Sequence, residues 1–277
     1  MTAISTFRFH ILLVDNLFIK GYNGRIVHGA FLQFIREFNE ELSTYLHEQQ
    51  QRRPYSLTEM EFRKMDDQWI AFFDVNTLDE KLISNMIQLL VSQDSHEIFL
   101  IDRFCPVFKI EYQKSVIPDP EPLPIGTRIW LNFESPTVFS STKRNAKTDP
   151  FPHLDVIYRQ LIDTYSRLVD EIPENDQALF IGYALNQLAT PKFKMKSKHM
   201  TIGHKIRVTG FVGSIMLMVE DNTHLELLKP ICKVAEVWGL GSKTTMGFGK
   251  LNINIYEPET TSEEKKSEEE VVDTPKH

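Results

Sequence analysis

The chain of 277 residues contains only 12 glycines and two cysteines, and it has no long apolar run. Its cysteines have no metal-ligand spacing and indicate no disulfide framework, so we expect both to be core residues of a cytoplasmic protein. No apolar stretch approaches the roughly 18 residues that cross a membrane. The N-terminal stretch also lacks the basic segment and small-residue cleavage site of a secretory signal, so we expect no membrane contact.

The net charge of −7 is unevenly distributed along the chain. The tail, residues 257–277, has eight acidic residues and three lysines, which leaves −2 for residues 1–256. We expect this tail to be disordered, because it lacks aromatic residues and periodicity. Between Asp176 and Glu220 there is no acidic residue but there are six basic ones. This basic stretch is typical of a surface for a polyanion and equally typical of a lysine-protected edge strand.

The apolar pattern divides into two halves with the same order of elements. In the first half, strand patterns occur around Phe7–Asp15, 53–64, 68–76 and 97–112, and helical patterns occur over Arg25–His47 and 78–93. Asn76 or Thr77 could cap the second of these helices. In the second half, we expect strands around 127–139, 178–189, 191–202, 204–220 and 250–256, and helices over 154–171 and 222–237. Each half is compatible with a β-α-β-β-α-β unit, the second with an extra hairpin.

The segment Val116–Gly126 contains four prolines and has no periodicity, so it is the best candidate for a linker. We therefore expect an N-terminal domain over 1–117, a linker over 118–126, a C-terminal domain over 127–256 and the acidic tail over 257–277.

Four of the glycines stand in one stretch, GLGSKTTMGFG, at positions Gly239, Gly241, Gly247 and Gly249. The stretch follows a predicted helix and precedes a predicted strand, which is the wrong order for a dinucleotide fingerprint, and it lacks the Gly-Lys-Ser/Thr of a phosphate loop. Its backbone N–H groups, together with Ser242, Lys243, Thr244 and Thr245, could still face phosphates. The simpler interpretation is a helix C-cap at Gly239 followed by a tight turn, which needs one glycine and not four.

The glycine pattern just before the last strand resembles the C-terminal signature of the RAMP superfamily of CRISPR systems. Three other stretches resemble the repeat-processing (pre-crRNA) endoribonuclease family within it: the His-Gly segment GRIVHGAFLQFI at Gly24–Ile35, ESPTVF with the later Phe-Pro at 134–152, and GFVGSIML at Gly210–Leu217. The four motifs occur in the order of that family and span most of residues 7–256. The resemblance implies an α+β fold of two tandem ferredoxin-like (RRM-like) domains, with RNA held across them.

The resemblance also implies a reaction. The family cuts RNA without a metal or other cofactor, using the 2′-hydroxyl as nucleophile, and leaves a 2′,3′-cyclic phosphate and a 5′-hydroxyl. Helical spacing alone favours a half-buried His28 that is bonded to a backbone carbonyl, whereas the resemblance makes His28 a catalytic acid or base. Tyr22 would transfer a second proton or position the RNA. Lys20 or Arg25 would stabilise the charge on phosphorus, with Arg36 as a further candidate cation.

An RNA-binding surface is expected from the basic residues. Lys192, Lys194, Lys196 and Lys198 alternate along one predicted strand, which would place them on one face at intervals of about 7 Å. Lys143 and Arg144 of the preceding loop would extend this surface. The expected partner is CRISPR repeat RNA, with effector-complex subunits as further candidates and a monomer or homodimer as the assembly. The alternatives are a non-catalytic RAMP subunit that holds guide RNA, and a general binder of single-stranded RNA.

Overall fold

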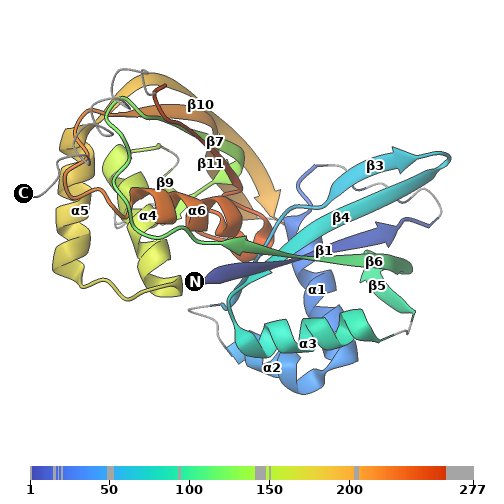
Figure 1. The fold of residues 1–277 in the computed structure, drawn as a ribbon. Coiled ribbons are helices and arrows are strands. Elements are labelled where there is room, and N and C mark those ends of the chain that lie inside the picture. Colours follow the sequence, from blue (N-terminus) through green and yellow to red (C-terminus); the bar gives the residue numbers. More distant parts are fainter. Residues whose placement is uncertain are drawn as a thin grey trace, which may run out of the picture.

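The computed structural model describes residues 2–14, 17, 19, 21–48, 53–92, 95–140, 148–149, 151–202 and 206–259. Two antiparallel sheets lie side by side in the molecule, and each has its own helices (Figure 1). The predicted tail lies outside the described residues, except for its first three positions. In the described part of the chain, no helix is long and apolar enough to cross a membrane.

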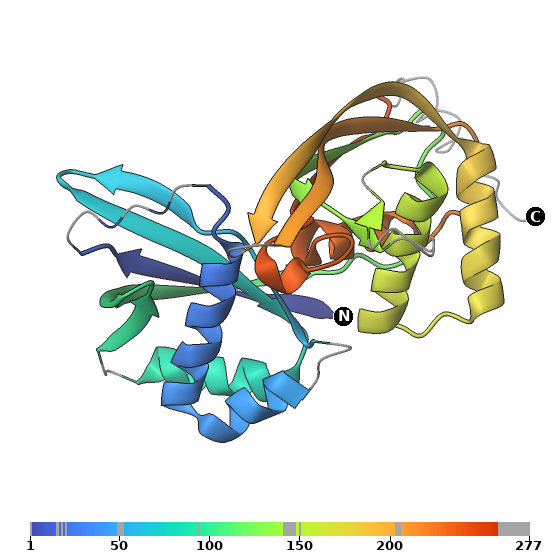
Figure 2. The ribbon, with the colours of Figure 1, turned by 180° about the vertical axis from the view of Figure 1, so that it is seen from behind.

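The first half forms a sheet in the order β2-β4-β1-β6-β5, with β3 paired to β4. Its elements follow the chain as β1 (Ala3–Leu12), α1 (Gly24–Phe38), α2 (Glu40–Glu48), β2 (Tyr55–Leu57), β3 (Glu61–Met65), β4 (Gln68–Thr77), α3 (Glu80–Val91), β5 (His96–Leu100) and β6 (Arg103–Val116). The helices lie together on one face of this sheet (Figures 1 and 2). Phe7, Phe9, Phe31 and Phe73 are among the fully buried residues between the two layers.

The second half forms a four-stranded sheet in the order β10-β11-β7-β12. Its elements are β7 (Arg128–Thr137), the short pair β8 (Phe139–Ser140) and β9 (Thr148–Asp149), α4 (Leu154–Leu168), α5 (Glu174–Gln187), β10 (Leu188–Ile202), β11 (Ile206–Val219), α6 (Leu228–Trp238), a 3₁₀ turn η1 (Thr244–Met246) and β12 (Leu251–Tyr256). In both halves the first strand is central and has two antiparallel neighbours: β1 pairs with β4 and β6, and β7 pairs with β11 and β12. This shared topology confirms the predicted pair of ferredoxin-like domains.

Several predicted elements have different boundaries or a different type. The single helix predicted over Arg25–His47 is two helices, because Asn39 is extended and its Oδ1 accepts the N–H of Leu42 at 3.0 Å, which caps α2. Asp79, and neither Asn76 nor Thr77, caps α3 by accepting the N–H of Leu82 at 2.8 Å. The strand predicted around 97–112 is the hairpin β5–β6, and the one over 53–64 is divided into β2 and β3.

The strand predicted over 178–189 is wrong, since most of that range belongs to helix α5. An apolar run of this length fits a buried strand or a helix equally well. The acidic residues Glu174 and Asp176, which follow Pro173, stand in the first helical turn, where negative charge is favourable. The helix predicted over 222–237 also begins later, at Leu228.

Both cysteines are buried, as predicted, and burial raises the pKa of each thiol, that of Cys232 to about 12. We propose that the boundary between the two domains lies within 118–126, where the structure has neither helix nor strand.

Candidate active site

The candidate site lies where the first turn of α1 contacts the glycine-rich stretch of the other half. Asn23, just before α1, exchanges two hydrogen bonds with the backbone of Met60, at 2.7 and 2.8 Å, and so fixes the start of the helix. The hydroxyl of Tyr22 donates to the carbonyl of Met246. Gly24 lies so close to the same carbonyl that an added Cβ would be 1.7 Å from its oxygen.

The backbone geometry of the glycine-rich stretch explains its four glycines. All four have φ between 73° and 91°, a range that side chains disfavour. Gly239 is the C-cap of α6, as the simpler interpretation predicted. A Cβ at Gly249 would lie 1.9 Å from the carbonyl oxygen of Leu240, and one at Gly247 would lie 2.6 Å from the backbone nitrogen of Glu59. The stretch therefore follows a path against its neighbours that only glycine permits at these points.

Many N–H groups of this stretch already have protein acceptors. Those of Ser242 and Gly249 donate to the carbonyls of Val138 and Pro136, and those of Met246 and Phe248 donate to the carbonyl of Lys243. The part that contacts α1 is η1, which contains Thr244 and Thr245. Contact with phosphate along the whole stretch is thus limited by its own hydrogen bonds.

His28 lies at the centre of this junction, and only 9% of its surface is exposed. Its Nε2 accepts a hydrogen bond from Nη1 of Arg53 at 2.8 Å, and the same Nη1 lies 3.4 Å from Oγ1 of Thr245. Because a guanidinium only donates, the proton of the neutral imidazole belongs on Nδ1. Arg53 therefore joins the histidine of α1 to the glycine-rich stretch.

The surroundings of His28 favour its neutral form. Burial, followed by the charge of Arg53, lowers the pKa of His28 to about 4, and the Thr245 backbone opposes part of this shift. Nδ1 is buried and has no partner with hydrogen-bond geometry among the residues that the structure describes. The ring of Tyr55 lies nearly parallel to the imidazole, with 6.3 Å between centroids. At neutral pH, His28 is thus a neutral base beside a permanent cation.

Tyr22 lies in an apolar cluster beside this pair. The centroids of its ring and the Phe248 ring are 4.8 Å apart, with an interplanar angle of 67°. The Tyr22 ring packs against the cluster formed by Val138, Met200, Ile202, Val208 and Phe248. Burial, with a smaller contribution from Glu59, raises the pKa of its hydroxyl. The hydroxyl is already bonded to Met246, so its environment suits a positioning role better than proton transfer.

The structure brings some of the predicted site residues together and separates others. His28, Tyr22, Thr244 and Thr245 meet at the junction. Arg25 is exposed in the first turn of α1, whereas Arg36 is exposed in its last turn, about 12 Å along the helix from His28. The predicted residues Lys20, Lys143 and Arg144 lie outside the described residues.

Sequence reasoning missed Arg53. This residue lies in the segment before β2 and reaches His28 because β2 runs beside α1 and η1. A weak signal was available, since two arginines and a proline directly precede the strand pattern at Tyr55.

The four predicted lysines are exposed along β10 and alternate with other residues, so they share one face. Nζ of Lys192 lies 5.7 Å from the ring centroid of Trp130 at one end of the row. Lys198 is close enough to Glu59 to oppose the rise that burial causes in the pKa of that carboxyl. Met200 and Ile202, just beyond Lys198, pack in the same cluster as Phe248. The row of lysines therefore leads to the glycine-rich stretch.

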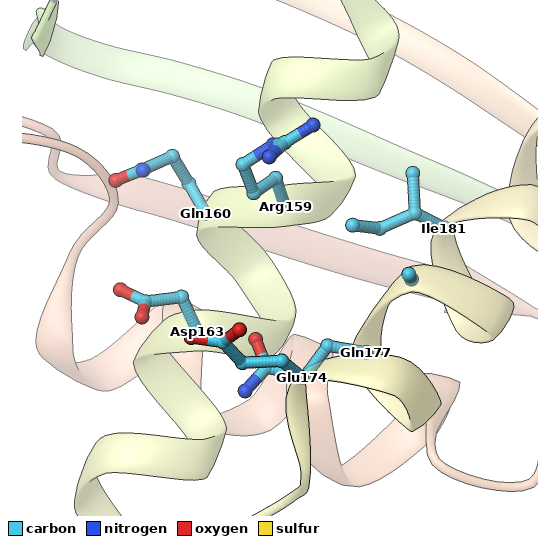
Figure 3. Close-up of a pocket in the computed structure, with 7 residues that line it drawn as sticks. Arg159, Gln160, Asp163, Glu174, Gln177 and Ile181 are labelled. Atoms are coloured by element: carbon cyan, nitrogen blue, oxygen red, sulfur yellow. The ribbon is translucent and has the colours of Figure 1, made fainter.

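A separate hollow of about 550 Å³ lies between α4 and α5, away from this junction (Figure 3). Two carboxylates, Asp163 and Glu174, line it beside Arg159. Gln177 in its wall donates to the carbonyl of Ile172 at 2.8 Å, which fixes the turn between the two helices. These charges and bonds suit a helix connection and do not favour an RNA site.

Comparison with known proteins gives one consistent family. The family model for CRISPR-associated endoribonuclease Cas6 matches residues 131–251. A curated Cas6 endoribonuclease from Streptococcus thermophilus is 23% identical over 238 residues, which are 82% of this chain and 89% of that protein. Among solved structures, a Cas6 product complex is 19% identical with a TM-score of 0.68, and it covers 91% of this chain and 100% of its own. A Thermus thermophilus Cas6 is 19% identical with a TM-score of 0.67, covering 92% and 99%.

The structural matches extend over both halves of the chain, beyond the range of the family model. At 19% identity the solved structures show only a shared fold. The similarity in sequence comes from the family model and the curated relative. The resemblance that the motifs predicted is therefore confirmed: in sequence and in fold, this chain is similar to the CRISPR-associated repeat-processing endoribonucleases called Cas6.

Proposed function

We propose that the protein is an endoribonuclease that cuts CRISPR precursor RNA within its repeats in the cytoplasm. The observation that carries the proposal is the pair His28–Arg53, a neutral base and a cation held 2.8 Å apart at the contact between the two halves. The similarity to Cas6 endoribonucleases supports the same activity. A solved Cas6 structure with a histidine-to-alanine substitution is also among the structural relatives, at 17% identity.

We assign His28 the removal of the proton from the 2′-hydroxyl of the RNA. The 2′-oxygen then attacks the adjacent phosphorus, the bond from phosphorus to the 5′-oxygen breaks, and that oxygen takes up a proton from water, while His28 returns its proton to the solvent. The products are a 2′,3′-cyclic phosphate and a 5′-hydroxyl, and the step requires no metal ion. A histidine accepts a proton only in its neutral form. The lowered pKa keeps His28 in this neutral form at pH 7.

Arg53 supplies the positive charge in this scheme. Its guanidinium can pair with a phosphate through two parallel hydrogen bonds and stabilise the charge that develops on phosphorus. A phosphate that draws Arg53 to itself also releases Nε2 of His28, since the guanidinium occupies that atom without RNA. Tyr22 positions the glycine-rich stretch through Met246. Lys20 and Arg25 stay as further candidate cations, and the exposed lysines of β10 hold the RNA backbone.

The proposal is tested by incubating the purified protein with repeat-containing RNA in excess EDTA. A single cut within the repeat, with a cyclic phosphate on one product and a 5′-hydroxyl on the other, is the expected result. Cleavage that requires a divalent cation, or that leaves a 5′-phosphate, would contradict the proposed chemistry.

A second candidate function is a non-catalytic RAMP subunit that holds guide RNA. The burial of His28 and the occupied Nε2 favour it, because a structural histidine would have the same contacts. Tight binding of repeat RNA without any cut in the same assay would support this alternative.

The pH dependence of cleavage distinguishes a base from an acid at His28. With His28 as the base, kcat/KM should be level near neutral pH and fall as the pH drops through about 4, where the imidazole becomes protonated. In Arg53→Gln, loss of the neighbouring charge should raise the pKa of His28 and move this fall to higher pH, while burial keeps the pKa below its ordinary value.

Arg53→Lys is the matched control, because it keeps the charge and should keep the fall near its original pH. The titration of the His28 ring can be followed independently by NMR. An unchanged titration in Arg53→Gln would show that Arg53 does not control the protonation of His28.

A further inference from the structure

The face of the first sheet opposite its own helices has a composition that the proposed cleavage site does not explain. Helices α1, α2 and α3 all lie on the opposite face (Figures 1 and 2). Alternate residues of β1 and β4, such as Phe9 and Phe73, point into the core on that side. The intervening residues of β1, β3, β4 and β6 therefore point away from the helices, and we call their surface the open face.

Three rings lie next to one another on the open face. His10 of β1 is directly opposite Phe72 of β4, with ring centroids 6.2 Å apart and an interplanar angle of 30°. Phe108 of β6 lies 5.8 Å from His10 at 67°. Phe108 is 52% exposed, although it is a large apolar residue. A β-bulge between His10 and Ile11 shifts the pairing with β6 at this point.

Two arginines lie beside the central ring. The guanidinium carbons of Arg8 and Arg63 are 5.5 and 6.0 Å from the centroid of Phe72. Asp74 holds Arg8 through two hydrogen bonds at 2.7 and 2.8 Å, whereas Arg63 makes no ion pair with any residue in the described part of the chain. A hollow of about 280 Å³ opens among Arg8, His10, Arg63, Phe72, Phe108 and Lys109.

The open face also contains acidic groups. Glu111 accepts from Lys109 and lies 3.2 Å from Nε2 of His10, and Asp74 is bound to Arg8. Glu61, which is opposite Phe72 on the same face, pairs with Lys250. Each of these carboxylates is thus bound to another cation, and Arg63 takes part in none of these ion pairs. The surface is therefore a stacking platform with a modest positive charge, which differs from the dense row of lysines on β10.

We propose that the open face binds unpaired nucleotides of an RNA strand by stacking their bases on Phe72, Phe108 and His10. Four-stranded sheets of this topology can bind single-stranded RNA when neighbouring strands present aromatic side chains. Arginine planes add stacking and cation–π contacts, and free guanidinium groups pair with phosphates. An aromatic and cationic surface suits a nucleic acid better than a purely apolar partner. His28 is on α1, which covers the opposite face, whereas Arg8 and Asp74 line a hollow together with Gly239 and Phe248, so one end of the open face adjoins the glycine-rich stretch.

The test measures binding of a short fluorescein-labelled oligouridine to the full chain by fluorescence anisotropy. Phe108→Ala and Arg63→Ala should each weaken binding, and Phe108→Ala should raise the Kd by about 5- to 150-fold, the usual range for loss of one stacked base. Leu179→Ala is the matched control, because Leu179 is 57% exposed on α5 of the other half, and its Kd should not change.

Photocrosslinking locates the bound strand independently. RNA with 5-iodouridine should crosslink to peptides from β1, β4 or β6 of the open face. Crosslinks confined to β10 or the glycine-rich stretch, or an unchanged Kd in Phe108→Ala, would overturn the proposal and leave a protein partner as the occupant of this face. Because the readout is binding, the result is decisive even if the protein cuts no RNA, so failure of the nuclease proposal and failure of this one are distinguishable.

Discussion

His28→Ala is expected to slow RNA cleavage by about 10²- to 10⁴-fold, which is the contribution of one positioned proton-transfer group. The substitution removes the neutral base and leaves Arg53 without its 2.8 Å partner. The rate should be measured under single-turnover conditions with protein in excess, so that binding and product release do not limit it. Binding of uncut repeat RNA should change much less than the rate, because His28 lies below the surface.

The matched control for this variant is His224→Ala, which removes an exposed histidine of the second half. Thermal unfolding of both variants would show whether His28→Ala is still folded, since truncation of a buried side chain leaves a cavity. A folded His28→Ala protein that cleaves as fast as the original chain would remove His28 from the reaction and support the RNA-holding alternative.

Gly24→Ala is expected to reduce cleavage by on the order of 10²-fold, through displacement of the glycine-rich stretch from α1. The added Cβ would lie 1.7 Å from the carbonyl oxygen of Met246 and 2.7 Å from the hydroxyl of Tyr22. The first contact is with backbone, so the two halves must move apart at the junction. This movement would separate Arg53 from Thr245 and disturb the pair with His28.

Gly29→Ala on the same helix is the control, because a Cβ there meets nothing within 4 Å. Alanine is the better helix former by about 1 kcal/mol, so Gly29→Ala should be as active as the original chain and at least as stable. Single-turnover rates and thermal unfolding of the two variants measure the difference. Equal rates for Gly24→Ala and Gly29→Ala would show that cleavage does not depend on this contact.

The alternating and helical patterns predicted most elements of both halves, because each element buries one face and its apolar residues repeat at the corresponding period. The pattern does not define ends. The helical spacing of apolar residues continues on both sides of Asn39, so the break between α1 and α2 was missed. The apolar run over 178–189 has no clear period, and the charges at its start, more than the run itself, distinguish a helix from a strand.

The candidate site was predictable only in part. His28 stands out because it opens a helix beside a glycine and its motif resembles a known family. Arg53 has no motif, and it reaches the site from a different segment of the same half. The open face could not be predicted either, since β3 pairs with β4 while β6 pairs with β1, and only this order brings Arg63, Phe72, His10 and Phe108 together.

By itself the sequence determined most of the element order, the α+β class, the row of lysines and the likeness to Cas6, because these depend on spacing and on motifs that are local in the chain. Only the tertiary structure decided what His28 meets. Arg53 and Thr245 are 192 positions apart, and they meet because the glycine-rich stretch of one half packs against α1 of the other. Burial and the charge of Arg53 then lower the pKa of His28, and both effects depend on contacts made only in the folded chain.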